Sequence, residues 1–592
     1  MRLPGGVWQR YLGCFLLAVV VELIVSAPGL ARIWHGGLAD PDSWMRLLRI
    51  RQGLRAGHLV NVVHRDESGA PLVIEWSRLF DAAIVALAAP LAPLLGWARA
   101  LRWAGLATAP LAAGALGAGL AFAAAPLSEP VLIWSAALIA PLLRGNLAFE
   151  RLGIIHYHIA MVAATAVTAG WALRAGGGRR AAGLATGLAG GVAIWIMPET
   201  MPFVMLCVGG LGWVWLYRPI GAAIGWLGIG LATVLLLALW LDPPHGGWRV
   251  AESDRASIIY AAQAVAVALA GWWLAWLDRR RWSADRRGAL GVILSLACFL
   301  AWLARYPEVA LGPYGLLPAA ERHLFFGHLV ETQPPRGIGQ VALLLGPGVF
   351  AVGVALAMMW RTRRQAVAAG SWGVVAIAGL LATVLTARFI IFMAFPAALA
   401  AGLLPVALTA ASRALADRPA WAAVARIGLI GLLLAVPYGV ALAALTIRPS
   451  AHAPHRARWS CSVDRAVPLL AAAAGQIVLT PYDMVPELLY RTRIIAVGSA
   501  YQHGVAGFVR AWKAWRASGV GPAPPPAFRA TGARFVLFCD GRGTPPSGGP
   551  ESLSARLRRG DPPAWLSLVG GGQDGPLLYR VVTPGTRPHI GR

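Results

Sequence analysis

Two acidic residues open a polar loop in a chain that is otherwise strongly apolar. Asp40 and Asp42 follow the first long apolar segment, Arg46 comes at helical spacing after them, and the polar stretch extends to about Arg78. Charged groups are costly to hold beside a bilayer unless they are used. Carboxylates can bind a divalent cation or orient a nucleophile, and an arginine can bind an anion such as phosphate. We interpret this loop as the first part of an active site.

Further polar residues interrupt the apolar sequence at later points. His156 and His158 form a His-x-His pair, Glu331 lies in a long polar loop, and Arg388 stands at the start of an apolar run. Imidazole and carboxylate groups together suit borderline divalent metals. Each residue alone also has an ordinary explanation, as a hydrogen-bonding histidine, a loop acceptor or an interfacial arginine. It is their recurrence on one side of a membrane that favours a single site.

The composition is that of a polytopic membrane protein. Of the 592 residues, 58% are hydrophobic and 13% are charged, which excludes a soluble globular protein. The formal net charge of +26 does not indicate nucleic-acid binding, because the arginines fall mostly in short loops between apolar runs. The charge is therefore a topology signal.

Fourteen apolar runs are long enough, or nearly so, to cross a bilayer. They are residues 12–31, 79–97, 104–126, 129–143, 158–173, 182–196, 201–217, 219–241, 258–277, 288–305, 338–360, 372–387, 389–412 and 424–447. Four loops between them are strongly basic, and counting crossings allows all four to lie on the cytoplasmic side. These loops are Arg174–Arg180, Arg279–Arg287, Arg361–Arg364 and Arg413–Arg426.

The loops of Asp40 and His156 are both expected on the outer side of the membrane. The number of membrane crossings between these two loops must therefore be even. Three runs lie between those loops, so one of them does not cross. We expect this to be 79–97, because Pro90 and Pro93 interrupt it, and we predict an interfacial or re-entrant helix. About thirteen crossings and an outer C-terminus remain.

The chain divides into a transmembrane domain, residues 1–447, and a soluble α/β domain, residues 448–592. In the second part, apolar strands such as 476–479 and 534–538 alternate with helical stretches. Cys461 and Cys539 both lie there and can pair if the domain is in an oxidising compartment. The outer loops expected to carry the active site are residues 32–78, 144–157 and 306–337.

The motifs in these loops resemble those of the catalytic subunits of oligosaccharyltransferases, the asparagine-glycan transferases of the membrane GT-C class. In that family the first outer loop carries an Asp, then Pro and aromatic residues, and an Arg six positions after the Asp; Asp40–Arg46 is similar. The second loop carries an acidic-x-acidic pair after a glycine, and here His156 and His158 occupy the acidic positions.

Two later motifs extend the resemblance. The long loop of the family ends with Glu-x-Gln-Pro, which Glu331, Gln333 and Pro334 match. The family also has an arginine near the outer surface at the start of a later helix, where Arg388 stands. The order of the motifs and their shared side of the membrane are more specific than any one of them.

The resemblance implies an inverting transfer of a sugar from a polyprenyl-diphosphate carrier. On this interpretation Asp40 ligates a divalent metal, with Asp42 as its substitute, and His156 and His158 are ligands or replacements for ligands. Glu331 positions the acceptor nucleophile. Mn²⁺, Mg²⁺ or Zn²⁺ is the implied cofactor, and two neutral histidines in place of carboxylates favour a nitrogen-seeking ion or a metal-free mechanism.

The resemblance also implies substrate contacts. Arg388 would pair with a carrier phosphate, and Arg46 and Gln333 are further substrate-binding candidates. The family reads the acceptor's Ser or Thr through a WWDYG motif, and Tyr482 and Asp483 stand at the corresponding place. The Asp is kept, whereas both tryptophans and the glycine are not. The acceptor is therefore open: a protein, a lipid or an envelope glycan.

We predict a multi-pass glycosyltransferase of a bacterial-type inner membrane, with its C-terminal domain periplasmic. Its partners are a polyprenyl-linked sugar donor and the bilayer, and not nucleic acid. A related enzyme using a monophosphate carrier to modify an envelope polymer remains open. So do a transporter or lipid flippase, which charged residues at the centres of several helices would support, and a non-catalytic relative that binds lipid-linked glycan.

Overall fold

The computed structural model describes residues 5–280, 282–312, 317–447, 461–541, 543–572 and 575–582. It contains two compact units, each built from segments that are far apart in the sequence. The predicted domain boundary falls beside residues 448–460, which lie outside the described residues. The helical unit comprises Met1–Ala39, Trp76–Leu316 and Val330–Arg448, and the sheet unit comprises Asp40–Glu75, Leu317–Leu329 and Pro449–Arg592.

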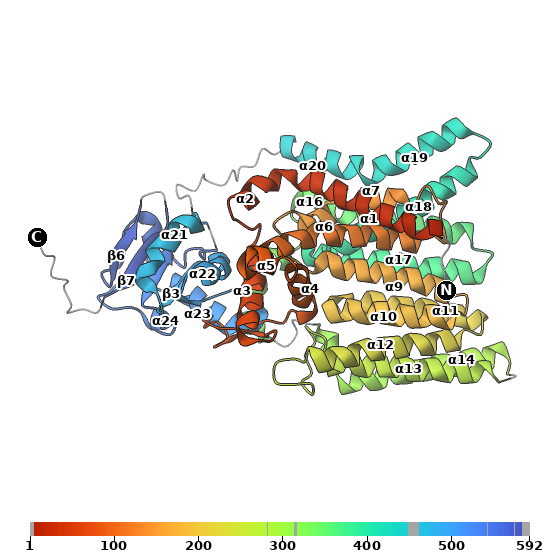
Figure 1. The fold of residues 1–592 in the computed structure, drawn as a ribbon, viewed down its shortest axis with the longest axis horizontal. Helices are drawn as coiled ribbons and strands as arrows, with labels where there is room; N and C mark the ends of the chain where they lie inside the picture. The colour runs from red at the N-terminus through yellow and green to blue at the C-terminus, as the bar shows by residue number, and fades with distance from the viewer. Residues whose placement is uncertain are drawn as a thin grey trace, which may run out of the picture. The chain divides into compact units, whose positions relative to one another are not determined.

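The helical unit has the composition of a multi-pass membrane protein. Within the described residues, nine helices are long and apolar enough to cross a membrane, or ten if a bent pair counts as one span. Helices α6, α9, α10, α12 and α13 pack successively side by side (Figure 1). The predicted number of thirteen crossings stays a prediction. The longer helices are α1 (Gly5–Ser26), α6 (Trp97–Ala124), α9 (His158–Ala175), α10 (Arg180–Ile196), α11 (Met201–Tyr217), α12 (Gly221–Leu241), α13 (Ile258–Asp278), α14 (Ala284–Arg305), α16 (Gly337–Arg361), α17 (Ala366–Arg388), α18 (Ala394–Ala414), α19 (Pro419–Leu433) and α20 (Ala435–Ile447).

Several of the predicted apolar runs are not continuous helices, and two of these bear on the predicted topology. Run 79–97 forms α4 (Arg78–Ala88) and the four-residue α5 (Ala92–Leu95), broken around Pro90 as the sequence predicts. Neither helix approaches the roughly 20 residues that a crossing needs. Run 129–143, which the sequence predicts as one crossing, is divided between short helices. These are α7 (Trp134–Ile139) and the 3₁₀ turn η2 (Ala140–Leu142), and α8 (Arg144–Glu150) begins directly after the run.

The break in the second run has a local cause. Pro141 lies in the 3₁₀ turn, and Leu143 after it is extended, with φ −77° and ψ 129°. Proline cannot donate the backbone hydrogen bond that would continue the preceding helix. The regular helix therefore ends before α8, whose last residue, Glu150, precedes the loop of the two histidines.

Asp242, directly after α12, fixes the start of α4. Its carboxylate accepts hydrogen bonds from Ser77 Oγ at 3.0 Å, from Arg78 Nε at 2.6 Å and from Trp195 Nε1 at 3.0 Å. It also forms an ion pair with Arg255. Because Asp242 is buried, this network of charged hydrogen bonds joins four separate parts of the helical unit.

The sheet unit contains a five-stranded mixed sheet with the strand order β4-β3-β5-β7-β6. Strand β3 is parallel to both β4 and β5, and β7 is antiparallel to β5 and β6. Strands β3 and β5 confirm the two segments predicted as strands. The strands are β3 (Ile477–Leu479), β4 (Ile495–Val497), β5 (Phe535–Phe538), β6 (Leu566–Gly571) and β7 (Leu577–Val581), and the helices are α21 (Val463–Leu469), α22 (Val485–Arg491), α23 (Val505–Arg516), α24 (Pro526–Arg529) and α25 (Leu553–Arg559).

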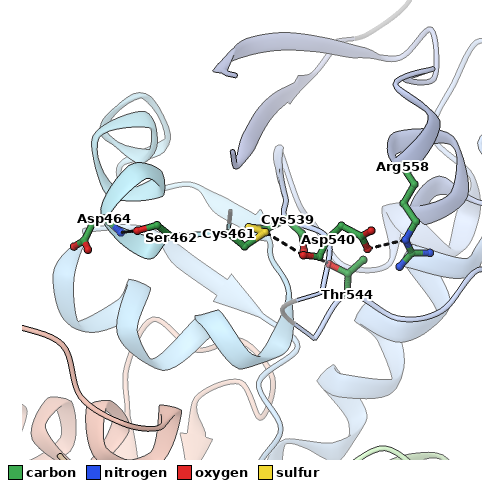
Figure 2. Close-up of a disulfide and its surroundings, with 7 residues drawn as sticks. All are labelled: Cys461, Ser462, Asp464, Cys539, Asp540, Thr544 and Arg558. Carbon is green, nitrogen blue, oxygen red and sulfur yellow. Dashed lines mark hydrogen bonds and ion pairs between the residues drawn. A yellow bond between two sulfur atoms is a disulfide. The ribbon is translucent and has the colours of Figure 1, made fainter. Parts of the chain in front are cut away.

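A disulfide closes the sheet unit. Cys461, which precedes α21, is bonded to Cys539 at the end of the central strand β5, across a sequence separation of 78 residues (Figure 2). The pairing that the sequence allows is thereby confirmed. The neighbouring Asp540 accepts a hydrogen bond from Arg558 Nε at 2.7 Å, which ties the same turn to α25 (Figure 2).

The first polar loop belongs to the sheet unit. It forms α3 (Pro41–Ala56) and a small hairpin of β1 (Val62–Val63) and β2 (Leu72–Val73). The guanidinium of Arg65 donates to the carbonyls of Leu489, Thr492 and Ile494 at 2.6 to 2.9 Å. Arg65 thus binds the end of α22 and the approach to β4, using main-chain acceptors.

A close backbone contact completes this attachment. Gly507 N donates to Ser68 O at 3.0 Å, and a Cβ at Gly507 would lie 2.2 Å from Ser68 Cα. Ser68 Oγ accepts hydrogen bonds from the backbone N–H groups of Gly498 and Ser499. A glycine is required at 507 because no larger residue leaves room for the loop. The short helix α15 (Ala319–Phe326) also packs on α23.

Candidate active site

Asp40 caps the helix that carries the first predicted motif. Its backbone is extended, with φ −149° and ψ 164°, and its Oδ1 accepts a hydrogen bond from Ser43 N at 2.7 Å. Pro41 follows as the first helical residue, where its missing N–H costs nothing. The Asp-Pro pair therefore has a structural role at the N-terminus of α3, whatever chemistry Asp40 adds.

Asp42 lies in the first turn of α3 and is held by a tyrosine of the sheet. Tyr501 Oη donates to Asp42 Oδ1 at 2.8 Å. Burial, and then the negative charge of Asp42, raise the pKa of Tyr501 well above its ordinary value, so the phenol stays a donor. Arg46, one turn after Asp42, is also buried. Sequence reasoning missed Tyr501 because no motif marks it.

Tyr482 and Asp483, which correspond to the acceptor-reading motif, lie in the 3₁₀ turn η8 (Tyr482–Met484). The Tyr482 ring packs against Phe508 with centroids 5.4 Å apart, and Phe325 of α15 packs edge-on against the same Phe508. Burial raises the pKa of Tyr482 to about 12. Tyr482 is thus part of an aromatic cluster that joins α15 to α23.

The two histidines of the second motif lie together in the helical unit. His158 is the first residue of α9, and its Nδ1 is 3.3 Å from the Nδ1 of His156. The ring of Phe149 stacks on His158 with centroids 4.1 Å apart, and Tyr157 stacks on it at 4.6 Å. The flanking aromatic rings hold both imidazoles in fixed orientations.

The third motif meets the histidine pair. Glu331 lies in the 3₁₀ turn η5 (Val330–Thr332), and one of its carboxylate oxygens is within 4.8 Å of a ring nitrogen of His156. Ile390 N donates to Gln333 O at 3.1 Å, which ties this segment to the turn that follows Arg388. The fold of the helical unit therefore brings together the predicted residues of the second and third motifs.

The donor set of this cluster fits a nitrogen-seeking divalent cation. Two nitrogen ligands at about 2.0–2.1 Å from a tetrahedral zinc ion lie about 3.3–3.4 Å apart, which matches the separation of the two Nδ1 atoms. The same separation suits an N–H···N hydrogen bond in a neutral pair. With the Glu331 carboxylate nearby, the set of two imidazoles and one carboxylate suits Zn²⁺ better than Mg²⁺, which prefers oxygen.

An apolar pocket of about 530 Å³ lies elsewhere in the helical unit. Helices α6, α9, α11, α17 and α18 line it, with side chains that include Val162, Phe203, Leu211, Trp372 and Leu403. Ligand pockets in proteins commonly measure about 300–1,000 Å³. Its apolar walls suit a hydrocarbon chain.

Asp66 gives the sheet unit a predicted pH dependence. This residue is fully buried in the loop docked on β4, its Oδ1 accepts from Ser68 N at 3.0 Å, and burial raises its pKa. A carboxyl whose folded pKa is raised stabilises the fold while it is protonated, and this stability is lost as the pH rises from the ordinary value of about 4 through the folded value.

We therefore expect the unfolding midpoint of the sheet unit to fall as the pH rises above about 4, and Asp66→Asn to remove that fall while keeping the acceptor for Ser68 N. The midpoint is measured on the full chain by monitoring its unfolding with limited proteolysis at several pH values between 4 and 8. Asp561→Asn, at an exposed acid of the same unit, is the control. An equal pH slope in both variants would contradict the assignment.

The comparisons with known proteins concern the fold. No family model matches the sequence, and no curated protein matches it. The fold is similar to that of the oligosaccharyltransferase of Archaeoglobus fulgidus. The structure of that protein with an inhibitory peptide and a dolichol-phosphate gives a TM-score of 0.67 at 11% identity, covering 89% of this chain and 69% of that one.

Two further structures of the archaeal protein agree. The apo form gives a TM-score of 0.65 at 12% identity, covering 89% of this chain and 69% of that one. The complex with Zn and sulfate gives 0.63 at 11% identity, covering 88% and 67% respectively. The resemblance predicted from the motifs is thus confirmed as a resemblance of fold.

Proposed function

We propose that the protein is a membrane glycosyltransferase that transfers a sugar or oligosaccharide from a polyprenyl-(di)phosphate carrier to a protein, lipid or envelope glycan. The observation that carries this proposal is the convergence of His156, Glu331 and the turn after Arg388 within one unit of an oligosaccharyltransferase-like fold. These are the residues that the motif resemblance assigns to ligand, nucleophile and phosphate contacts.

The donor supplies a long isoprenoid chain and an anionic phosphate. The apolar pocket between α6, α9, α11, α17 and α18 suits the chain, because its lining is almost entirely hydrocarbon. Arg388 is exposed at the end of α17, where its planar guanidinium suits bidentate contact with a phosphate. The archaeal relative has been solved with a dolichol-phosphate, which is a carrier of the same chemical class.

The residues divide the chemistry between them. Glu331 orients the acceptor and takes the proton of its nucleophile as the nucleophile attacks the anomeric carbon of the sugar and the bond from that carbon to the phosphate oxygen breaks. Arg388 stabilises the negative charge on the departing phosphate, and Arg46 and Gln333 are proposed as further substrate contacts.

His156 and His158 are proposed to hold a divalent metal. The motif resemblance assigns the acidic ligand to Asp40 or Asp42, and that assignment stays a prediction from the sequence. When bound, this ion would act as a Lewis acid that neutralises charge on the phosphate leaving group. Zn²⁺ suits the two imidazoles, and Mn²⁺ or Mg²⁺ is the alternative if the carboxylates dominate. The archaeal relative has been solved with Zn and sulfate.

The sheet unit is proposed to lie outside the cytoplasm, in the periplasm of a bacterial-type inner membrane. The disulfide Cys461–Cys539 supports this location, because disulfides persist in oxidising compartments and are rare in the cytosol. The acceptor need not carry an Asn-x-Ser/Thr sequence. Tyr482 replaces a motif tryptophan and packs in an aromatic cluster instead.

The proposal predicts sugar transfer in membranes supplied with radiolabelled polyprenyl-linked sugars. We expect Glu331→Gln and Asp40→Ala to reduce transfer by about 100-fold or more, because a positioned acid–base group or charge stabiliser contributes that much. Glu129→Gln is the matched control, since Glu129 is a partly exposed acid paired with Arg413.

Each other outcome removes a specific part of the proposal. Unchanged transfer in both variants would overturn the site assignment but keep the enzyme. Absence of transfer by the wild-type protein, with intact binding of the lipid-linked sugar, would favour a non-catalytic binding protein. Movement of the lipid across the membrane without transfer would favour a flippase.

A further inference from the structure

Two acidic residues of the helical unit take no part in the proposed function. Glu22 lies on α1, within an apolar span, and Glu150 is the last residue of α8. Both side chains are completely buried. Ionisable residues at such positions are costly and usually functional. The sequence contains this signal, because Glu22 is the sole acidic residue of the run 12–31.

Three of the four carboxylate oxygens of Glu22 and Glu150 lack a hydrogen-bond partner among the described residues. Ser26 Oγ donates to Glu22 Oε1 at 2.7 Å. Within the part of the chain that the structure describes, Glu22 Oε2 and both carboxylate oxygens of Glu150 have no hydrogen-bond partner. No arginine, lysine or histidine among those residues forms an ion pair with either group.

A third side chain independently points to the same place. Asn146 is completely buried, and its Nδ2 donates to Ala140 O at 2.9 Å, which fixes the orientation of the amide. Its Oδ1 has no hydrogen-bond partner among the described residues. Asn146 precedes Glu150 by four residues on α8, so both side chains lie on the same face of that helix.

The two helices approach each other through the turn η2. Helix α1 packs against η2 (Ala140–Leu142), which in turn packs against α8. The hydrogen bond from Asn146 Nδ2 to Ala140 O places the amide of α8 beside the same turn on which α1 packs. Burial, and then the negative charge of Glu22, raise the pKa of Glu150 to about 8.

The buried groups that need a partner are all oxygen acceptors. Burying an acceptor without a partner costs free energy. A positive ligand is the partner that satisfies all of them. Carboxylate and amide oxygens, with neither nitrogen nor sulfur among them, are the ligands of hard cations such as Ca²⁺.

We propose that Glu22, Glu150 and Asn146 form a binding site for a hard metal cation, with Ca²⁺ as the best match to two carboxylates and an amide. The site is chemically distinct from the histidine cluster, whose imidazoles favour Zn²⁺. It joins α1 to α8 directly before the loop of His156, so the bound cation stabilises the segment that presents the histidines.

The test measures thermal unfolding of the full chain in detergent, after treatment with EDTA in potassium buffer at pH 7. We expect CaCl₂ to raise the unfolding midpoint of the wild-type protein by several degrees. Glu150→Gln and Glu22→Gln should abolish this rise.

Controls separate this site from the proposed catalytic one. Glu129→Gln should respond to calcium like the wild type, and so should His156→Ala. If Mg²⁺ or Na⁺, and not Ca²⁺, raises the unfolding midpoint, and Glu150→Gln abolishes that rise, the site is supported for a different hard cation. A calcium effect that survives in Glu150→Gln, or stabilisation that follows only acidification and no metal, overturns the proposal.

Discussion

Replacing Cys461 by serine is expected to lower the free energy of unfolding of the sheet unit by about 4 kcal/mol. The disulfide closes a loop of 78 residues, and the loss of loop-closure entropy in the unfolded chain gives stabilisation of this size. The bond also joins the segment before α21 to the central strand of the sheet, so its removal should unfold most of the unit at once.

Pulse proteolysis of the full chain in urea measures this effect, with cleavage products assigned by a C-terminal tag. Cys298→Ser is the matched control, because Cys298 is an unpaired cysteine of α14. A reducing agent should lower the stability of the wild-type protein to that of Cys461→Ser and leave the variant unchanged. Equal stability of Cys461→Ser and the control would contradict the expectation.

Replacing Asp242 by alanine should destabilise the helical unit by about 3–5 kcal/mol, the usual cost of removing one partner from a buried ion pair. Asp242 accepts from Ser77, Arg78 and Trp195 and pairs with Arg255, so the variant removes the acceptor of two guanidinium groups. The start of α4 should lose its attachment to α12.

Thermal aggregation of the detergent-solubilised protein measures this loss. Asp242→Asn should fall between the wild type and alanine, because the amide oxygen still accepts hydrogen bonds but carries no charge. Asp285→Ala, at an exposed acid of α14, should change stability by less than about 0.5 kcal/mol. Equal stabilities of the alanine variants would show that the network has no net effect.

The sequence predicts much of the helical unit because hydrophobicity alone decides it. Nearly all of the apolar runs coincide with helices, and the interruption of run 79–97 follows from Pro90. The run 129–143 is different, since its composition does not reveal that Leu143 adopts an extended backbone after Pro141. Burial pattern and helix length are therefore easier to predict than the place where a helix breaks.

The sequence also predicts the members of the helical-unit site, but not their supports. The spacing of His156 and His158 and the Glu-x-Gln-Pro motif identify residues that the fold brings together. Tyr501, which donates to Asp42, has no motif around it, and it is 459 residues away in the chain. Contacts of this kind depend on tertiary packing that local patterns do not encode.

The attachment of the first loop to the sheet unit was equally hidden from the sequence. Arg65 binds three carbonyl oxygens, and every residue type offers a carbonyl. Gly507 admits Ser68 only because it lacks a side chain. Main-chain recognition leaves almost no trace in residue types, and so the sequence predicts the loop but not its partner.

This attachment sets an order of events during synthesis. Arg65 is made 429 residues before Ile494, whose carbonyl it binds. At a translation rate of about 5–20 residues per second, the loop waits roughly 20–90 seconds for its partner to be made. During that interval the face of α3 that packs on α22 in the folded protein has no partner. The first loop must therefore stay unaggregated, on its own or bound to another protein, until the last quarter of the chain has been synthesised.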